Sequence, residues 1–250
     1  MATKVNIKLK KYLSNAGYCS RRNANQFIED NLIKINSEIA SSDSLLKHGD
    51  IVLINHKKEI VDLNPKTDIL IYHKPTGQIC SSIGTDNNQS VFEFLPKRNH
   101  GKWIMVGRLD VNTSGLLIFS NNGDLVQKLS HPSSMIERKY LCRIYGIPNE
   151  ELLKKLIKGV TIDGKESNFD KLEALKNKPD SKNTWFKVTL HSGRNREVRK
   201  LWESQSLQVN RLIRTGFGPI ILPKELKKGK HSYLSTKEIH DVLDLLNLNN

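Results

Sequence analysis

Residues 106–125, VGRLDVNTSGLLIFSNNGDL, place a single carboxylate, Asp110, in a polar loop between two apolar runs that we expect to be strands. Gly107 and Gly115 flank this loop, and Arg108 lies two residues before the acid. Loops held by rigid strands are where proteins usually present reactive groups. An aspartate in such a turn also commonly bonds only its own backbone. The stretch therefore predicts a strand–loop–strand unit and leaves open whether Asp110 is catalytic or structural.

Outward from this loop, strand-like and helical segments follow one another irregularly. Because the strands do not alternate strictly with helices, we expect an α+β fold whose sheet is mixed and mostly antiparallel, with flanking helices, rather than a doubly wound parallel one. The pattern predicts strands at 69–72, 103–106, 116–120, 139–145, 185–191 and 209–215, and helices at 124–130, 149–158 and 195–204.

The N-terminal part has a different pattern. Residues 7–31 predict two short helices separated at Gly17, and Ser20 is placed to cap the second. Two short β segments are expected after them, at 33–35 and 51–54. This part is therefore a compact α+β unit of its own.

A polar segment separates this unit from the rest of the chain. Residues 56–66, HKKEIVDLNPK, contain Pro65 and show no strong period, which is typical of a linker. We therefore expect two domains, with limits at residues 1–60 for the first, 61–67 for the linker and 68–245 for the second.

The charge balance favours a polyanionic partner. Lys and Arg number 40 against 26 Asp and Glu in the 250 residues, a net charge of +14, and residues 1–60 alone carry +4. Such an excess attracts a polyanion, and nucleic acid is the commonest one in a cell. A Lys-rich face that is merely solvated is the alternative. The candidate RNA contacts of the first domain are Lys8, Lys10 and Lys11 on its first helix and Arg21 and Arg22 at the start of its second, where backbone N–H groups also favour phosphate.

Several classes of protein are disfavoured. No apolar stretch approaches the roughly 20 residues that cross a bilayer, and the N-terminus lacks the apolar region of a secretory signal. We therefore expect no membrane contact and a cytoplasmic location. Cys19, Cys80 and Cys142 are too far apart in sequence for a metal cluster or a disulfide framework and are expected to be buried apolar residues. With the histidines equally scattered, no metal site is predicted.

The first domain resembles a known RNA-binding module. The run IKLKKYLSNAGYCSRRNANQFIEDNLIKINSEI, followed by HGDIVLI, is similar to the alpha-L module, also called the S-four module, over nearly all of residues 6–55. That module occurs in ribosomal proteins, some tRNA synthetases and RNA-modifying enzymes. The resemblance thus implies structured RNA as a partner rather than one reaction.

The second domain resembles the pseudouridine synthases. GRLD followed by NTSGLL is similar to their catalytic motif, HPSSMIERKYLCRIYG to their second motif, and GRNREVRKLWE with VNRLIRTGFGPIILPKEL to their third. The two resemblances together span roughly residues 6–235. They imply a catalytic role for Asp110, stacking of Tyr140 beside the target base, Arg199 as the basic partner of the acid, and Leu212 as the apolar residue packed near it. Arg194 and Arg196 lie in the same run as Arg199, so the arginine that pairs with Asp110 stays open.

The reaction of this family requires few groups from the protein. Isomerising uridine breaks the bond from N1 to C1′, turns the free base and joins C1′ to C5, so no cofactor is implied. Asp110 could attack C6, attack C1′ or remove a ribose proton, and the sequence does not choose among these routes. Because stacking hides the reacting atoms, the target base must be flipped out. Further candidates for phosphate contacts near the site are Arg108, Arg194, Arg196, Arg211 and Arg214.

The sequence as a whole indicates a synthase that modifies one uridine in large-subunit (23S) ribosomal RNA or its precursor, acting as a monomer. The alternatives are a non-catalytic RNA-binding factor of ribosome assembly and a synthase acting on small-subunit ribosomal RNA or on tRNA. Asp110, Tyr140 and the arginine cluster occur together here. Since a degenerate relative would be expected to lose the carboxylate first, the catalytic interpretation is favoured.

Overall fold

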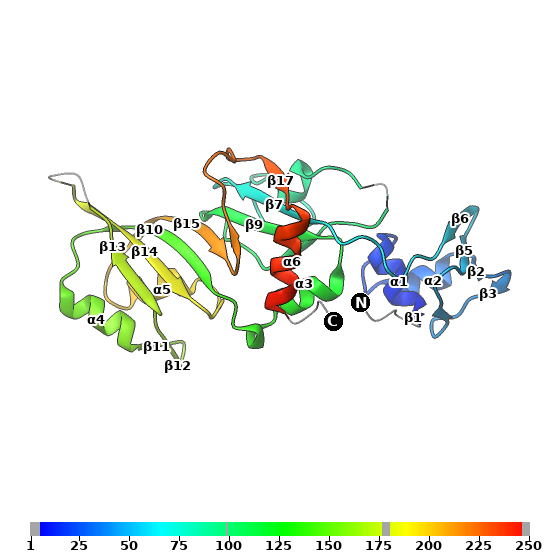
Figure 1. Cartoon of the computed structure of the whole chain (residues 1–250), viewed down its shortest axis with the longest axis horizontal. Helices are drawn as coiled ribbons and strands as arrows, with labels where there is room; N and C mark the ends of the chain where they lie inside the picture. The colour runs from blue at the N-terminus through cyan, green and yellow to red at the C-terminus, as the bar shows by residue number, and fades with distance from the viewer. Residues whose placement is uncertain (1–5, 99, 177–180, 247–250) are drawn as a thin grey trace.

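The computed structural model describes residues 6–98, 100–176 and 181–246 (Figure 1). The N-terminal elements gather at one end of an elongated molecule, and a large sheet with its helices forms the rest. The N-terminal elements are β1 (Ile7–Lys8), α1 (Leu9–Ala16), α2 (Ala24–Asp30), β2 (Ile33–Ile35), β3 (Glu38–Ile39), β4 (Leu45–Leu46), β5 (Ile51–Ile54) and β6 (Lys57–Ile60).

Two helices and a small antiparallel sheet form the N-terminal unit, as expected. Leu9 and Leu13 are fully buried on one face of α1, and Gly17, at φ 93°, ends that helix. The expected cap of α2 is wrong in detail. Ser20 Oγ accepts a hydrogen bond from the N–H of Asn23 at 3.1 Å, in a turn that precedes the helix. Arg21 and Arg22 therefore lie exposed in that turn rather than in the first turn of α2.

The segment expected to be a linker belongs in part to this unit. Strand β6 pairs with β5 and completes a four-stranded sheet of order β3-β2-β5-β6. Val61 is fully buried and Leu63 is 5% exposed, both in the hydrophobic core of the N-terminal unit. The interpretation of 56–66 as a linker was wrong for this half, because a polar strand at the edge of a sheet lacks the apolar period on which that interpretation depended.

The central sheet is mixed and mostly antiparallel, as predicted. Its order is β13-β14-β10-β15-β9-β7-β17, with β8 on β9 and β16 on β15. Among the described strand pairs of this sheet, β9 and β15 alone run parallel. The strands are β7 (Ile69–Lys74), β8 (Ile104–Val106), β9 (Ser114–Ser120), β10 (Arg138–Tyr145), β13 (Lys171–Ala174), β14 (Asn183–Leu190), β15 (Val209–Phe217), β16 (Ile220–Ile221) and β17 (His231–Tyr233).

The helices cover the two halves of this sheet separately. Helices α3 and α6 pack on the half built from β7 and β9, in a core that includes Ile71 and Ile118. Helices α4 and α5 pack on the half built from β10 and β14, where the Phe186 and Trp202 ring centroids lie 4.9 Å apart. The remaining elements are 3-10 helix η1 (Val91–Phe94), α3 (Gly123–Ser130), 3-10 helix η2 (Pro132–Ser134), α4 (Glu150–Lys158), hairpin β11 (Val160–Ile162) and β12 (Lys165–Ser167), α5 (Glu197–Glu203) and α6 (Thr236–Leu245).

The cysteines are all free, but only Cys142 is fully buried, whereas Cys19 and Cys80 are half-buried. Expecting all three to be core residues was wrong for these two, because a short apolar side chain in a loop carries no period that reveals its depth. Within the described ranges, no group of His, Cys, Asp and Glu could hold a metal ion, and no helix is long and apolar enough to cross a membrane.

The two halves of the sheet meet where β9 runs beside β15. Gly115, at φ 111°, packs there so tightly that a Cβ atom would lie 2.2 Å from the carbonyl oxygen of Arg214 and 2.6 Å from its amide nitrogen. Both contacts are to backbone, which cannot move aside as a flexible side chain can. Only glycine therefore allows β9 to approach β15 at this point.

Replacing Gly115 with Ala is expected to lower the free energy of unfolding by about 3 kcal/mol or more, because backbone strain at positive φ and steric overlap act together. Urea denaturation followed by circular dichroism measures this loss. Gly164→Ala is the matched control. Its φ is 73° and no atom lies within 4 Å of the added methyl group, so strain alone should cost about 1 kcal/mol. Equal losses in the two variants would contradict the tight approach.

Candidate active site

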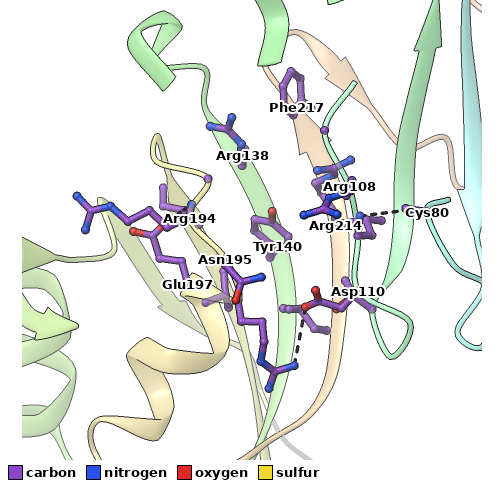
Figure 2. Close-up of a pocket in the computed structure, with 18 of the residues that line it drawn as sticks. Cys80, Arg108, Asp110, Arg138, Tyr140, Arg194, Asn195, Glu197, Arg214 and Phe217 are labelled. Atoms are coloured by element: carbon purple, nitrogen blue, oxygen red, sulfur yellow. Dashed lines mark hydrogen bonds and ion pairs between the residues drawn. The ribbon is translucent and has the colours of Figure 1, made fainter. Parts of the chain in front are cut away.

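A cavity of about 590 Å³ opens between the Asp110 loop, strands β10 and β15, and the start of α5 (Figure 2). Its wall includes Asp110, Tyr140, Arg196 and Leu212. The Asp110 loop and the motifs that lie far downstream in the sequence therefore line one cavity. The convergence follows from the sheet order, which places β15 between β9 and β10.

Asp110 lies in a loop whose backbone is fixed by hydrogen bonds from a buried lysine. The Lys74 ammonium is fully buried and donates hydrogen bonds to the carbonyl oxygens of Asp110 at 3.0 Å, Thr113 at 2.9 Å and Pro75 at 3.1 Å. The Asp110 side chain remains 35% exposed. A rigid backbone beneath an accessible carboxylate is the arrangement that a reactive group needs.

Lys74 is a residue that the sequence analysis missed. Burial lowers the pKa of its ammonium, while nearby Cys80 and Asp110 oppose that shift. Three carbonyl dipoles compensate the buried charge in place of a carboxylate partner. A lysine that ends an apolar run directly before a proline was the available signal, but nothing local links it to a loop 36 positions away.

Arg196, rather than Arg199, lies next to Asp110. An Nη1 atom of Arg196 is 4.0 Å from Oδ2 of the acid, and its Nη2 is 3.6 Å from Oε1 of Glu203. Arg199 is 5% exposed and donates instead to the carbonyl oxygens of Val209 at 2.9 Å and Asn112 at 3.0 Å. The expected pairing with Arg199 is therefore corrected: this guanidinium holds the loop from behind.

The conformation at the start of α5 explains why Arg196, and not Arg199, lies beside Asp110. The helix begins at Glu197, not near residue 195, and Arg196 precedes it in a left-handed conformation at φ 54°. Arg199 then faces the sheet instead of the cavity, and burial lowers the pKa of its guanidinium. Lys200, in the same helix, forms an ion pair with Asp163 of the β11–β12 hairpin.

Tyr140 and Leu212 both line the cavity that contains Asp110. They are on neighbouring strands of one sheet face, since Tyr140 is opposite Arg214 and Cys142 is opposite Leu212 in the β10–β15 register. Figure 2 shows the Tyr140 ring in the middle of the cavity, with Asp110 to one side. Leu212 is 5% exposed and belongs to the core below.

The other candidate cations divide into groups. Arg108, Arg194 and Arg214 line the cavity, although Arg194 also donates to Ser167 Oγ and the Glu166 carbonyl oxygen, both at 2.7 Å. Arg211 is exposed on β15 but is not among the described lining residues, because side chains alternate between the faces of a strand.

The N-terminal cations lie in a different unit from this cavity. Lys8 is exposed and Lys10 half-buried. Lys11 Nζ is 2.7 Å from Oδ1 of Asp124 on α3, and Lys102 Nζ donates to the Cys19 carbonyl oxygen at 3.1 Å. These two contacts join the N-terminal unit to the rest of the protein. Lys11, which we expected to bind RNA, is therefore paired with Asp124 instead.

Comparisons with known proteins agree with both sequence resemblances. Residues 68–204 match the RNA pseudouridylate synthase family and residues 7–52 match the S4 domain. The chain is 41% identical over 244 residues to ribosomal large subunit pseudouridine synthase B of Buchnera aphidicola subsp. Acyrthosiphon pisum, covering 96% of this chain and 98% of that one. The same-named protein of Buchnera aphidicola subsp. Schizaphis graminum is 43% identical, covering 96% and 95%.

A solved structure, described as a crystal structure of pseudouridylate synthase, shares the fold. It superposes with a TM-score of 0.63 at 23% sequence identity, covering 94% of this chain and 99% of that one. At this identity the likeness concerns the fold alone.

Variants of the two arginines should separate their roles. Arg196→Ala is expected to lower kcat/KM on RNA about tenfold or more without changing the melting temperature, because a half-exposed pair at 4.0 Å adds little to stability. Arg199→Ala should instead cost about 3 kcal/mol of folding free energy, since it leaves the Asn112 and Val209 carbonyls without their donor. Thermal unfolding and steady-state kinetics test both, and the reverse pattern would restore Arg199 as the partner of Asp110.

Proposed function

The chain belongs to the RNA pseudouridylate synthase family, and from this premise we propose that it isomerises a specific uridine of large-subunit (23S) ribosomal RNA with Asp110 as the catalytic carboxylate. Relatives that are about as long as this chain and 41% and 43% identical to it bear the name ribosomal large subunit pseudouridine synthase B. The observation that carries the assignment of Asp110 is its accessible carboxylate on a rigidly held loop at the wall of the cavity.

Uridine isomerisation asks three things of the site. The bond from N1 to C1′ must break, the freed uracil must be held while it turns, and the proton on C5 must leave once C1′ has joined that carbon. No atom is gained or lost overall. A carboxylate, a surface for the base and a proton acceptor are therefore sufficient.

The described residues match these tasks. Asp110 acts as the carboxylate at C6, at C1′ or on a ribose proton, and Arg196 beside it orients its oxygens. Tyr140 stacks on the uracil face, a contact worth about 1–3 kcal/mol, and its hydroxyl is a candidate acceptor for the C5 proton. Leu212 supports the base from below. Lys74 and Arg199 act through the loop backbone as positioning residues.

RNA binding is divided between the two units. The S4 domain supplies a grip on structured RNA through its exposed cations, and the cations around the cavity hold the strand that carries the everted base. We retain two domains, with the first extended to Leu63, which packs in its core. We further propose that the protein acts as a monomer in the cytoplasm.

A non-catalytic assembly factor is the rival from another class. Such a protein would need the charge and the fold but no accessible acid. The hydrogen bonds from Lys74 fix the backbone that carries the accessible Asp110, and this arrangement favours an enzyme.

Asp110→Asn is expected to abolish release of tritium from ribosomal RNA labelled at uracil C5, while RNA affinity stays within a few-fold of the wild type, because the amide keeps the shape but cannot act as a carboxylate. Asp86→Asn, which changes an exposed carboxylate in a loop, serves as the matched control and should keep full activity. A pseudouridine map of ribosomal RNA from cells with and without the gene identifies the nucleotide. Undiminished release by the Asp110 variant would refute the assignment.

The S4 domain should contribute to the salt dependence of binding. Replacing both Arg21 and Arg22 with Ala is expected to flatten the plot of log affinity against log salt by about 0.7 to 0.9 per lost phosphate contact. The matched control removes two cations elsewhere, Lys154 and Lys155 on α4, which are paired with Glu150 and Glu151. Filter binding at several salt concentrations measures the slope for each variant. If the Arg21/Arg22 variant and the Lys154/Lys155 control have the same slope, the proposed RNA contact of the S4 domain is contradicted.

A further inference from the structure

Two buried guanidinium groups line the cavity, Arg138 at the end away from Asp110 and Arg214 between that end and the acid (Figure 2). Arg138 is 9% exposed and Arg214 is 3% exposed, and both line the cavity. They share one aromatic ring, since their Cζ atoms lie 5.1 Å and 5.5 Å from the Phe217 centroid. Figure 2 shows Phe217 and Arg138 at one end, Asp110 at the other, and Tyr140 and Arg214 between them.

The hydrogen bonds that hold these arginines are all to neutral groups. Arg138 Nη1 donates to the carbonyl oxygens of Ile136, at 2.8 Å, and His191. Arg214 Nε donates to the Leu116 carbonyl oxygen at 2.8 Å, while its buried Nη2 has no partner. Neither guanidinium forms an ion pair with any residue in the described part of the chain.

Glu197, an acid that lines the same cavity, forms no ion pair with either guanidinium. Glu197 accepts hydrogen bonds from Ser192 Oγ at 2.7 Å and from the Arg194 amide at 3.0 Å, so both its oxygens are engaged. Burial is the largest cause that lowers the pKa of Arg138; Tyr140 opposes this shift, Arg214 adds to it, and Glu197 has a weaker opposing effect. Burying two cations around one aromatic ring without an ion-pair partner among the described residues is costly, which points to an anion that binds beside them in the cavity.

The backbone around Arg138 is shaped to keep its guanidinium in place. A Cβ atom on Gly193 would lie 2.9 Å from Arg138 Cζ and 3.0 Å from its Nε and Nη2. Gly193 therefore lies flat against one side of the group while Phe217 covers another. A cation clamped in this way is preorganised for a ligand in the cavity.

We propose that Arg138, Arg214 and Phe217 form an anion subsite that holds one backbone phosphate next to the target uridine. This inference rests on the proposed function. A phosphate supplies the missing negative charge, and its oxygens match the planar donors of guanidinium. The neutral carbonyl oxygens of uracil would leave both charges uncompensated, and Asp110 and Tyr140 already define the base end of the cavity. At about 590 Å³ the cavity has room for more than one base.

The test uses the full-length protein and a synthetic RNA stem-loop that spans the uridine found by mapping. Each phosphodiester near that uridine is replaced, one at a time, by an uncharged methylphosphonate. In the wild type, one linkage is expected to weaken binding by about tenfold or more, the loss of a charge-assisted hydrogen bond. Arg214→Gln should weaken binding of the unmodified RNA to a similar degree, and the same linkage should then cost no more than about twofold.

Two further variants sharpen the result. Arg211→Gln removes a neighbouring cation on β15 that does not line the cavity, and it should leave the tenfold effect of that linkage unchanged. Gly193→Ala keeps both charges but displaces Arg138, so it should reduce the effect of the same linkage.

The possible outcomes are distinct. A flat scan in the wild type overturns the subsite without reference to any variant, and so does a small uniform loss at every linkage. Coupling that appears with Arg211 as strongly as with Arg214 overturns it too, as does a fall in kcat with no coupling to any linkage. Tritium release from the unmodified stem-loop by the wild type is measured in parallel. Its absence would contradict the proposed function, whereas normal release with a flat scan would reject the subsite alone.

Discussion

The close approach of β9 and β15 at Gly115 is the constraint on which the rest of the structure depends. The strands are so near one another that a methyl group would lie 2.2 Å from the Arg214 carbonyl oxygen. Each strand carries a different part of the site, because β9 follows the Asp110 loop and β15 carries Leu212 and Arg214. The separately packed halves of the sheet thus meet in one cavity, whose opposite walls come from residues about 100 positions apart.

Two buried cations, Lys74 and Arg199, fix the position of the Asp110 loop. Lys74 binds the carbonyls of Asp110 and Thr113 from the β7 side, and Arg199 binds the carbonyl of Asn112, which lies between them in the loop, from the α5 side. Both groups are charged and out of contact with water, so they are expensive to bury unless each donor finds an acceptor. The loop backbone provides most of those acceptors and Val209 of β15 provides one more, while the buried Nε of Arg199 has no partner. Stability and the orientation of Asp110 are therefore linked through the same hydrogen bonds.

The positive charge of this chain accordingly has more than one role. Lys74 and Arg199 hold backbone, Lys11 joins the N-terminal unit to α3, and Arg196 lies beside the acid. Exposed cations such as Arg22 remain for long-range attraction of RNA. Net charge indicates a polyanionic partner, but burial and hydrogen bonding decide which cation can meet it.

The patterns along the chain predicted many of the local elements and the family, and they indicated Asp110 as the candidate carboxylate. Periodicity placed the predicted strands and helices within a few residues because it depends only on neighbours along the chain, but it did not find strands β13 and β17 or helix α6. The motifs indicated Asp110 and Tyr140 without reference to distance. Which arginine lies beside Asp110 follows only from the three-dimensional structure, because α5 begins at Glu197 and leaves Arg196 outside the helix in a left-handed conformation, whereas Arg199 binds the Asn112 carbonyl. The same holds for Lys74, for the Arg138–Phe217–Arg214 cluster and for the packing of Leu63. Each of these depends on contacts between segments distant in the chain, which no local pattern encodes.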